Sequence, residues 1–357
     1  MKRAKVGIDV QSTRGRKTGI GVYTENLLAG LRRVARQYEC LPISRGRSGD
    51  FRTHRRLLWQ QVLLPLQARI AGVRLLHIPG FDAPRWAPCP TVLTVHDLIG
   101  ALFPGNFPPV SRWYWSSWLP KSIRWADRVI ASSHSTRRDI LRLTGVPGEK
   151  IHVVYPGVGE EFRPVEDASR LERTAAKYRL PRKFLLFVGT LEPRKGVDVL
   201  LEAFRLLAGE TDHHLVLVGR AGWGVEDLPG QLRRADFCAR VHWKGFIDPG
   251  DLANLYNLAG LLVFPSRYEG FGLPPLEAMA CGVPVVCTET SSLPEVVGDA
   301  AIRVPVGEAH SLAEGILRAL TDRELRERLR TLGLHRARTF SRDDAAGQVA
   351  AVYDSLL

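Results

Sequence analysis

Short apolar runs alternate with longer amphipathic stretches along most of this chain. Runs of this length rich in Val, Ile and Leu predict buried strands, and a period near 3.6 predicts helices. Strands that alternate with helices at this spacing indicate βαβ units, parallel sheets and an α/β fold class. The predicted strands are residues 4–10, 74–79, 91–97, 126–133, 151–155, 184–188, 215–218, 241–243, 261–264, 283–287 and 301–306, and the main predicted helices are 136–143, 197–207, 252–259, 311–320, 322–338 and 342–357.

The length of 357 residues exceeds what one hydrophobic core usually supports, so we expect two domains. Residues 156–167 (PGVGEEFRPVED) are rich in Gly, Pro and acids, which is typical of a linker. The predicted division is residues 1–165, residues 166–340 and a C-terminal helix, 341–357, whose apolar face packs back on the first domain.

Residues 51–72 (FRTHRRLLWQQVLLPLQARIAG) are basic at their start and amphipathic beyond it. Such a segment lies either on a membrane or on the sheet. We favour packing of its apolar face on the sheet. The apolar face is Leu57, Leu58, Val62, Leu63 and Leu66, and the basic start leaves Arg52, Arg55 and Arg56 as candidate phosphate contacts.

Charge is divided unevenly between the two halves. Residues 1–165 hold 26 Lys and Arg against 11 Asp and Glu, whereas residues 166–357 hold 24 against 26. The basic first half predicts an anionic partner, either a membrane surface or a phosphate-bearing acceptor. A generally basic proteome is the alternative explanation.

The expected location is the cytoplasm, with peripheral contact to the inner face of the cell membrane. No apolar run approaches the roughly 20 residues that span a bilayer, and the start of the chain enters a strand without a signal-peptide pattern. The cysteines are odd in number and contain no C-x-x-C pair, which predicts reduced, mostly buried thiols. They are Cys40, Cys89, Cys238, Cys281 and Cys287.

The most informative stretch is residues 261–287, LLVFPSRYEGFGLPPLEAMACGVPVVC. A buried strand turns through Gly270, Phe271 and Gly272 into a helix with two prolines in its first turn. Glu269 and Glu277 therefore lie at the carboxyl end of a strand and near the start of a helix. Ligands bind at that edge of an open parallel sheet, and a helix N-terminus suits a phosphate.

Three further segments carry candidate chemistry. Arg194 and Lys195 follow one strand, His96 and Asp97 end another, and Gly19 and Gly21 precede a helix that carries Tyr23. Positive charge at a helix start opposes the helix dipole, so a merely solvated pair of cations is disfavoured. Asp97 either orients His96 or caps the next turn. The glycine loop is a poor dinucleotide fingerprint, because Thr24 replaces its third glycine and Glu39 comes before the next strand.

The spacing Glu269, seven residues, Glu277 within EGFGLPPLEAMACGVPVV resembles retaining, nucleotide-sugar-dependent glycosyltransferases of the GT-B, family 4 type. Within them it is most similar to bacterial mannosyltransferases of surface polysaccharides. The resemblance implies two facing Rossmann-like domains, with the donor bound mainly to the second and the acceptor to the first, and a last helix that returns to the first domain.

The resemblance also implies residue roles. His96, Glu269, Arg194 and Lys195 are the implied catalytic residues, and His96, Asp97 and Tyr23 are candidate acceptor contacts. Arg194 and Lys195 would bind the diphosphate, Glu277 the ribose, Glu269 the sugar hydroxyls, and the turn Lys244–Ile247 the base. The implied donor contacts are Gly19, Gly21, Arg194, Lys195, Phe246, Ile247, Glu269, Gly270, Phe271, Gly272, Leu273 and Glu277.

The predicted reaction transfers a hexose from an NDP-sugar to a saccharide or lipid-linked acceptor, with retention and without a cofactor or metal. GDP-mannose is the first choice of donor, followed by UDP-glucose, UDP-galactose and dTDP-rhamnose. A covalent role for Glu269 is disfavoured, because no second close carboxylate is evident. The alternatives are a nucleotide-sugar epimerase of this architecture and a nucleic-acid-binding protein, although nothing matches a nucleic-acid recognition motif.

Overall fold

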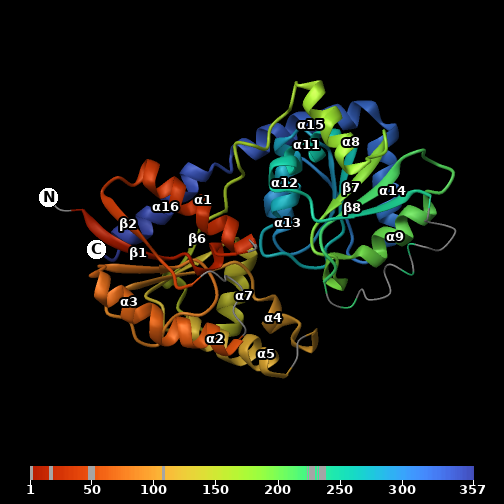
Figure 1. Cartoon of the computed structure of the whole chain (residues 1–357). Helices are drawn as coiled ribbons and strands as arrows, with labels where there is room; N and C mark the ends of the chain where they lie inside the picture. The colour runs from red at the N-terminus through yellow and green to blue at the C-terminus, as the bar shows by residue number, and fades with distance from the viewer. Residues whose placement is uncertain are drawn as a thin grey trace. The chain divides into compact units, whose positions relative to one another are not determined.

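The structure is a computed structural model, and it describes residues 3–15, 19–46, 53–106, 109–222, 224, 230, 232 and 239–357. The chain divides into two compact units (Figure 1). The first comprises residues 1–157 and 340–357, and the second comprises residues 158–339. The second unit thus begins within the predicted linker, at Val158.

The first unit contains a six-stranded parallel sheet in the order β2-β1-β3-β4-β5-β6. Its strands are β1 (Ala4–Asp9), β2 (Tyr38–Ile43), β3 (Leu75–Ile78), β4 (Thr91–Val95), β5 (Arg128–Ala131) and β6 (Ile151–Val153). Its helices are α1 (Gly19–Val34), α2 (Thr53–Leu58), α3 (Leu64–Ala71), α4 (Ile99–Leu102), α5 (Pro109–Trp113), α6 (Leu119–Ile123), α7 (His134–Thr144) and α16 (Arg342–Asp354).

Two hydrophobic clusters form the core of this unit. One includes Leu27 and Leu31 of α1 together with Val349 and Tyr353 of α16, which packs beside α1 (Figure 1). The predicted return of the last helix to the first domain is therefore confirmed. The other cluster gathers side chains from α3, α6 and α7. Strand β2 was not predicted, and Glu39 lies inside it, not before it.

The second unit repeats the architecture with the strand order β12-β11-β10-β7-β8-β9, again all parallel. Helices α9 and α14 pack together over one large core cluster. The strands are β7 (Phe184–Val188), β8 (His214–Val218), β9 (Val241–Gly245), β10 (Leu261–Phe264), β11 (Val285–Thr288) and β12 (Ile302–Val304). The helices are α8 (Ala168–Tyr178), α9 (Val197–Leu206), α11 (Pro249–Leu258), α12 (Leu273–Ala280), α13 (Leu293–Val297), α14 (Ala309–Thr321) and α15 (Arg323–Arg338).

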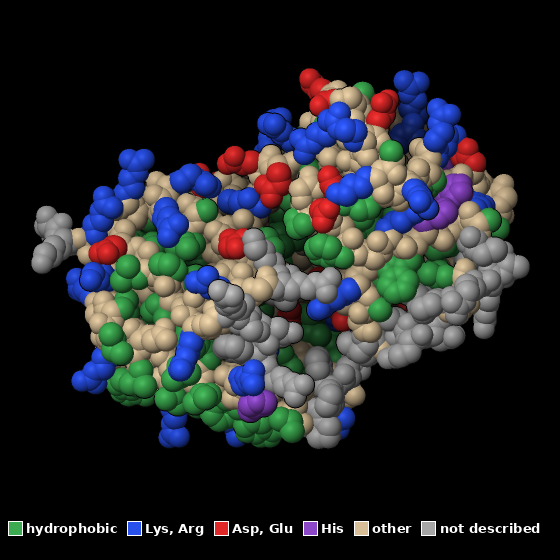
Figure 2. Space-filling view, viewed as in Figure 1, with side chains coloured by type: hydrophobic (Ala, Val, Ile, Leu, Met, Phe, Trp, Pro, Cys, Tyr) green, Lys and Arg blue, Asp and Glu red, His purple; other side chains and the backbone are tan. Residues whose placement is uncertain are grey.

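The apolar face predicted for residues 51–72 is wrong in part. Leu58, Val62 and Leu66 are exposed, and Ile70 continues their row. Residues Trp59–Leu63 form a π-helical turn between α2 and α3. A π turn takes more residues than an α turn, so it rotates the buried face to Trp59, Leu64 and Ala68. Figure 2, viewed as Figure 1, shows hydrophobic side chains over the position of α2 and α3.

Four of the five cysteines fall in the described part of the chain, and all four are free thiols. Cys281 and Cys287 are buried, whereas Cys40 and Cys89 are half-buried. Cys238 and Arg52 lie outside the described residues. Among the helices that the structure describes, none combines the length and the hydropathy needed to cross a membrane.

Candidate active site

The second sheet changes direction of winding between β7 and β10. From β7 the chain proceeds to β8 on one side, and β10 lies on the other side. In open parallel sheets the crevice for a ligand forms at the carboxyl ends of the strands that flank such a switch point. Lys195 follows β7 and Glu269 follows β10, so the two predicted segments meet at this edge.

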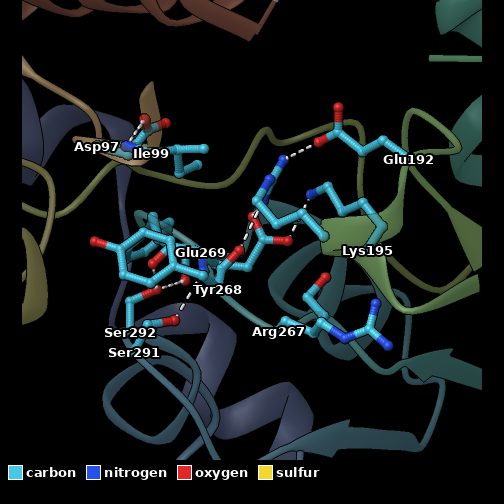
Figure 3. Close-up of polar contacts among 12 residues, drawn as sticks. Asp97, Ile99, Glu192, Lys195, Arg267, Tyr268, Glu269, Ser291 and Ser292 are labelled. Atoms are coloured by element: carbon cyan, nitrogen blue, oxygen red, sulfur yellow. Dashed lines mark hydrogen bonds and ion pairs between the residues drawn. The ribbon is translucent and has the colours of Figure 1, made fainter. Parts of the chain in front are cut away.

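Lys195 and Glu269 form a buried ion pair. The Lys195 ammonium donates to Glu269 Oε1 at 2.5 Å, and both side chains are about one-tenth exposed (Figure 3). Burial alone would raise the pKa of Glu269, but Lys195 and Arg194 together hold that pKa below its ordinary value. Glu269 is therefore a carboxylate at neutral pH, a hydrogen-bond acceptor suited to sugar hydroxyls.

Arg194 is also held within the protein. Its guanidinium donates to the Tyr268 carbonyl at 2.6 Å, forms an ion pair with Glu192, and lies 3.4 Å from Glu269 Oε2. Its side chain is 13% exposed. The alternative of solvated cations at a helix start is therefore wrong for both Arg194 and Lys195.

A glycine lets the segment that carries Arg194 and Lys195 approach the segment that carries Glu269. Gly196 has φ of +68°, and a Cβ at this position would lie 2.1 Å from the Pro265 carbonyl oxygen. The Arg267 N–H also donates to the Arg194 carbonyl at 2.7 Å. Any side chain at Gly196 would push the β7 and β10 loops apart and separate Lys195 from Glu269.

The loop from Gly270 to Leu273 leads into α12, which carries two prolines in its first turn as predicted. Gly272 has φ of +109°, a conformation that strongly favours glycine. Two serines after β11 hold this loop, and neither was predicted from the sequence. Ser291 Oγ accepts from the Glu269 N–H at 2.8 Å, and Ser292 Oγ donates to the Glu269 and Phe271 carbonyls at 3.0 and 2.7 Å (Figure 3).

Glu277 projects from α12 one helical turn beyond that loop. Its Oε2 accepts a hydrogen bond from the Tyr256 hydroxyl at 2.8 Å. Tyr256 lies in α11 and is fully buried, and its burial beside Glu277 raises the pKa of the phenol well above the ordinary value. Tyr256 was not predicted from the sequence, and its hydroxyl fixes one oxygen of the Glu277 carboxylate and therefore its orientation.

The predicted base-binding turn is placed differently from the expectation. Lys244 and Gly245 belong to β9, and only Phe246 and Ile247 follow the strand. Phe246 is exposed, whereas Ile247 is buried. An exposed aromatic ring after a strand at this edge offers a stacking surface, and Ile247 contributes to the core.

In the first unit, His96 follows β4 directly. Its Nε2 lies 2.7 Å from the Pro79 carbonyl, which can only accept, so Nε2 carries the proton and Nδ1 is the ring's acceptor. The Tyr23 ring meets the imidazole edge-to-face at 4.6 Å between centroids. Burial lowers the pKa of His96. Asp97 Oδ1 accepts from the Ile99 N–H at 3.0 Å, so Asp97 caps the following turn (Figure 3).

Gly19 and Gly21 lie in the first turn of α1, not in a loop before it. A Cβ on Gly21 would lie 2.4 Å from the Ser12 carbonyl oxygen, so this glycine permits close packing of the β1–α1 loop on the helix. Gly19 has open space around it. Gly21 therefore has a packing reason of its own, and its donor contact stays a prediction.

Comparison with known proteins agrees with this geometry. Residues 170–335 match the family model described as Glycosyl transferases group 1, and residues 17–162 match Glycosyltransferase Family 4. The O-antigen chain mannosyltransferase B of Escherichia coli is 34% identical over 79% of this chain and 74% of that protein.

Two solved structures share the fold over nearly the whole chain. The sucrose-phosphate synthase of Thermosynechococcus elongatus has a TM-score of 0.80 at 22% identity, covering 99% of both chains. Anabaena HepE in complex with UDP-glucose has a TM-score of 0.76 at 22% identity, covering 99% of this chain and 100% of that one. With its two parallel sheets and these matches, the chain belongs to the GT-B glycosyltransferases of family 4, group 1.

Proposed function

We propose that this glycosyltransferase transfers mannose from GDP-mannose to a saccharide or lipid-linked acceptor in surface polysaccharide synthesis, with retention at the anomeric carbon. The observation that carries the proposal is the buried cluster of Arg194, Lys195 and Glu269 at the switch point of the second sheet. The mannosyl group is proposed because the similar protein from Escherichia coli is a mannosyltransferase. Membership of a transferase family favours this reaction over the epimerase alternative.

In this proposal the second unit binds the donor. Arg194, Lys195 and the amides at the start of α12 take the diphosphate, whose charge grows as the sugar departs. Glu277 takes the ribose hydroxyls and Glu269 the hydroxyls of the sugar. Two cations neutralise the leaving group in this scheme, so transfer should proceed without a divalent metal. Turnover that is unchanged by EDTA would support this part, and a strict Mg²⁺ or Mn²⁺ requirement would refute it.

Retention by departure and attack on the same face suits this arrangement better than a covalent intermediate. Both cations engage Glu269, and an ion-paired carboxylate is a poor nucleophile. The measurement is the anomeric configuration of the first-formed product by NMR. An inverted product would exclude the proposed course.

The donor can be identified by thermal shift and by acceptor-dependent release of nucleotide. GDP at about 100 times its Kd should stabilise the protein by about 2.7 kcal/mol, whereas UDP, dTDP and ADP should stabilise it less. A larger shift with UDP would replace mannose by another sugar, and HepE, whose structure contains UDP-glucose, makes UDP-glucose the first competitor.

We further propose that the first unit contacts an anionic membrane through the exposed row on α2 and α3. Leu58, Val62, Leu66 and Ile70 are spaced four apart and are 44–86% exposed. Arg55 and Arg69 are exposed on the same segment. Apolar side chains beside cations suit the interface of an anionic bilayer. The variant Leu66→Glu/Ile70→Glu should lose co-sedimentation with phosphatidylglycerol vesicles, whereas Val306→Glu on the second unit should retain it.

A further inference from the structure

A second histidine, with no part in the chemistry described above, lies in the core of the first unit. His77 belongs to β3 and is fully buried. Its register partner on β4 is Val92, and Leu75 precedes it on the same face of the sheet; both belong to an apolar cluster. Burial lowers the pKa of His77 to about 3, so the imidazole is neutral at pH 7. Burying a polar ring costs free energy unless its hydrogen bonds are made, so the partners of His77 define its role.

Both ring nitrogens of His77 are bonded to hydroxyl groups. Its Nδ1 lies 2.6 Å from the Tyr353 hydroxyl of α16, and its Nε2 lies 2.8 Å from Thr94 Oγ1 of β4. Among the described residues, the Tyr353 hydroxyl has no acceptor other than Nδ1, so it donates there. A neutral imidazole carries one proton, so Nε2 holds it and donates to Thr94. The hydrogen bonds therefore run in one direction, from α16 through β3 to β4.

A second bond joins the same two strands two residues further along each of them. There the Pro79 carbonyl accepts from His96 Nε2 at 2.7 Å. Strands β3 and β4 are parallel neighbours, so the His77–Thr94 bond and the Pro79–His96 bond are successive ties between them. The first tie lies inside the sheet, and the second lies just past the carboxyl ends of the strands.

Tyr23 continues the chain of contacts on the side of α1. Its hydroxyl lies 3.4 Å from Thr94 Oγ1, the longest contact of the chain, and its ring meets the His96 imidazole edge-to-face at 4.6 Å. Thr94 accepts from His77, so its own O–H is available to donate to Tyr23. The imidazole of His96 is thus contacted by the Pro79 carbonyl and by the Tyr23 ring, and the pair of His77 and Thr94 adjoins both contacts.

A buried polar network whose members are all bonded makes a core more rigid and more specific. Such rigidity matters most beside a reacting group, because a misplacement of about 1 Å can lower a rate about 10²-fold. For His96 the identity of the protonated nitrogen matters as well. If the proton moved from Nε2 to Nδ1, the ring would present a donor in place of its acceptor.

We propose that His77 is a positioning residue for His96. This inference rests on the proposed function, in which His96 acts in the transfer. His77 and Thr94 hold β3 and β4 at the separation at which the Pro79 carbonyl accepts from His96. That bond keeps the proton on Nε2 and keeps Nδ1 as an acceptor for a hydroxyl group of the substrate. Tyr353 fixes the His77 ring, so the C-terminal helix takes part in arranging the site of the first unit.

The first test compares Thr94→Val, which keeps the shape of the side chain and loses the hydroxyl, with Thr94→Ser, which keeps the hydroxyl and loses the methyl. The readout is the ¹⁵N shifts of the two His96 ring nitrogens, assigned by their loss in His96→Ala, which report where the proton lies. The wild type and Thr94→Ser should show the proton on Nε2, whereas Thr94→Val should show a mixture of both tautomers. Thr94→Val should also lower kcat about 10-fold at an unchanged donor KM, less than the loss from a misplacement of about 1 Å.

A purely structural role predicts the opposite order, because the lost methyl of Thr94→Ser would then cost more stability than the lost hydroxyl. Thr94→Val that melts early but keeps the His96 tautomer and kcat overturns the proposal, and so does a wild-type His96 protonated on Nδ1. Absence of turnover in the wild type with every donor would instead refute the proposed function, and the ¹⁵N shifts would still decide whether His77 holds His96.

If Thr94→Val does not fold, two tyrosine variants decide the question. Tyr353→Phe removes the hydroxyl that donates to His77. Tyr38→Phe is the matched control, because Tyr38 is also buried and its hydroxyl donates to Asp354 of the same helix without touching His77. Tyr353→Phe should shift the His96 nitrogens toward the mixture of tautomers, and Tyr38→Phe should leave them as in the wild type. Equal results for the two variants would overturn the proposal.

Discussion

The two units place polar side chains at the same point of the same sheet and use opposite chemistry there. At the β7/β10 switch point of the second unit, opposite charges are paired, because Lys195 and Arg194 both form ion pairs with Glu269. At the β1/β3 switch point of the first unit, the buried Asp9 carboxylate accepts from neutral donors, and Gln60 Oε1 has no hydrogen-bond partner among the described residues. The first arrangement suits a ligand with high charge, whereas the second keeps a single carboxylate buried through hydrogen bonds from neutral groups.

Substitutions in the cluster of Arg194, Lys195 and Glu269 should have the largest effect on turnover and stability. Lys195→Met should lower kcat about 10²–10³-fold with little change in the donor KM, because charge on the leaving diphosphate grows in the transition state. It should also lower stability by about 3–5 kcal/mol, since Glu269 becomes a buried, partly uncompensated charge. The measurements are steady-state kinetics and urea unfolding of the same samples.

A double variant separates the two effects of Lys195. Lys195→Met/Glu269→Gln carries no lone charge and should recover most of the lost stability but none of the turnover. Lys183→Met is the control, because Lys183 pairs with Asp212 in an exposed bridge of 2.7 Å that should contribute little. If Lys195→Met raised only KM and left kcat intact, its role would be uniform binding, and the contrast between the two switch points would weaken.

Substitution of His96 should cause the next largest loss of turnover. His96→Ala should reduce turnover about 10²-fold, the scale of one lost transition-state contact, and leave GDP binding nearly unchanged. Since burial lowers the pKa of His96, its contribution to stability should be present at neutral pH and decline as the pH falls below about 6.5. Tyr23→Phe, which keeps the ring against the imidazole, should be mild. A variant that melts early yet turns over normally would make His96 a core residue only.

Substitution of Glu277 should have the next largest effect, a loss of nucleotide affinity. Glu277→Ala should weaken GDP binding by about 1.5–3 kcal/mol, as for hydrogen bonds to a charged group. Tyr256→Phe removes only the hydroxyl that orients the carboxylate and should cost about 0.5–1.5 kcal/mol. Calorimetric titration with GDP compares the two. Equal affinity of wild type and Glu277→Ala would remove Glu277 from the nucleotide site.

The two switch points also differ in how much of each could be predicted from the sequence. In the second unit the key residues come from two short segments, each a strand end followed by a helix start, so strand prediction alone brings them to one edge. The family resemblance then supplied their roles. The serines after β11 escaped notice because their contacts are with the backbone of another loop, and a Ser-Ser-Leu-Pro-Glu segment after a strand was the only signal.

The hydrogen bonds around Asp9 in the first unit could not be predicted in this way. Asp9 lies at the end of a predicted strand, but Gln60 reaches it only because a π-helical turn rotates residues 59–63. Leu58 lies before this turn and Leu66 after it, and both are exposed. A π turn follows from tertiary packing and leaves no clear sequence pattern, so both the contact between Gln60 and Asp9 and the exposed row required the structure.

Substitution of Asp9 should have the smallest effect, a change in stability, and it compares the two switch points most directly. Its pKa rises from 3.8 to about 6 on folding, so the folded state binds the proton more tightly than the unfolded state. Stability should therefore fall as the pH rises from about 4 to 6 and stay level above that range.

Asp9→Asn removes this cost, and the Gln60 amide can turn so that its oxygen accepts from the new Asn N–H. We expect a gain of about 1–2 kcal/mol at pH 7, the scale seen when a functional group is made less strained. Urea unfolding of the wild type and of Asp9→Asn at pH 4.5 and pH 7 measures this difference. A variant that is less stable than the wild type at pH 7 would show that the hydrogen bonds of the charged carboxylate stabilise the fold by more than its burial costs, and the two switch points would then both depend on charge.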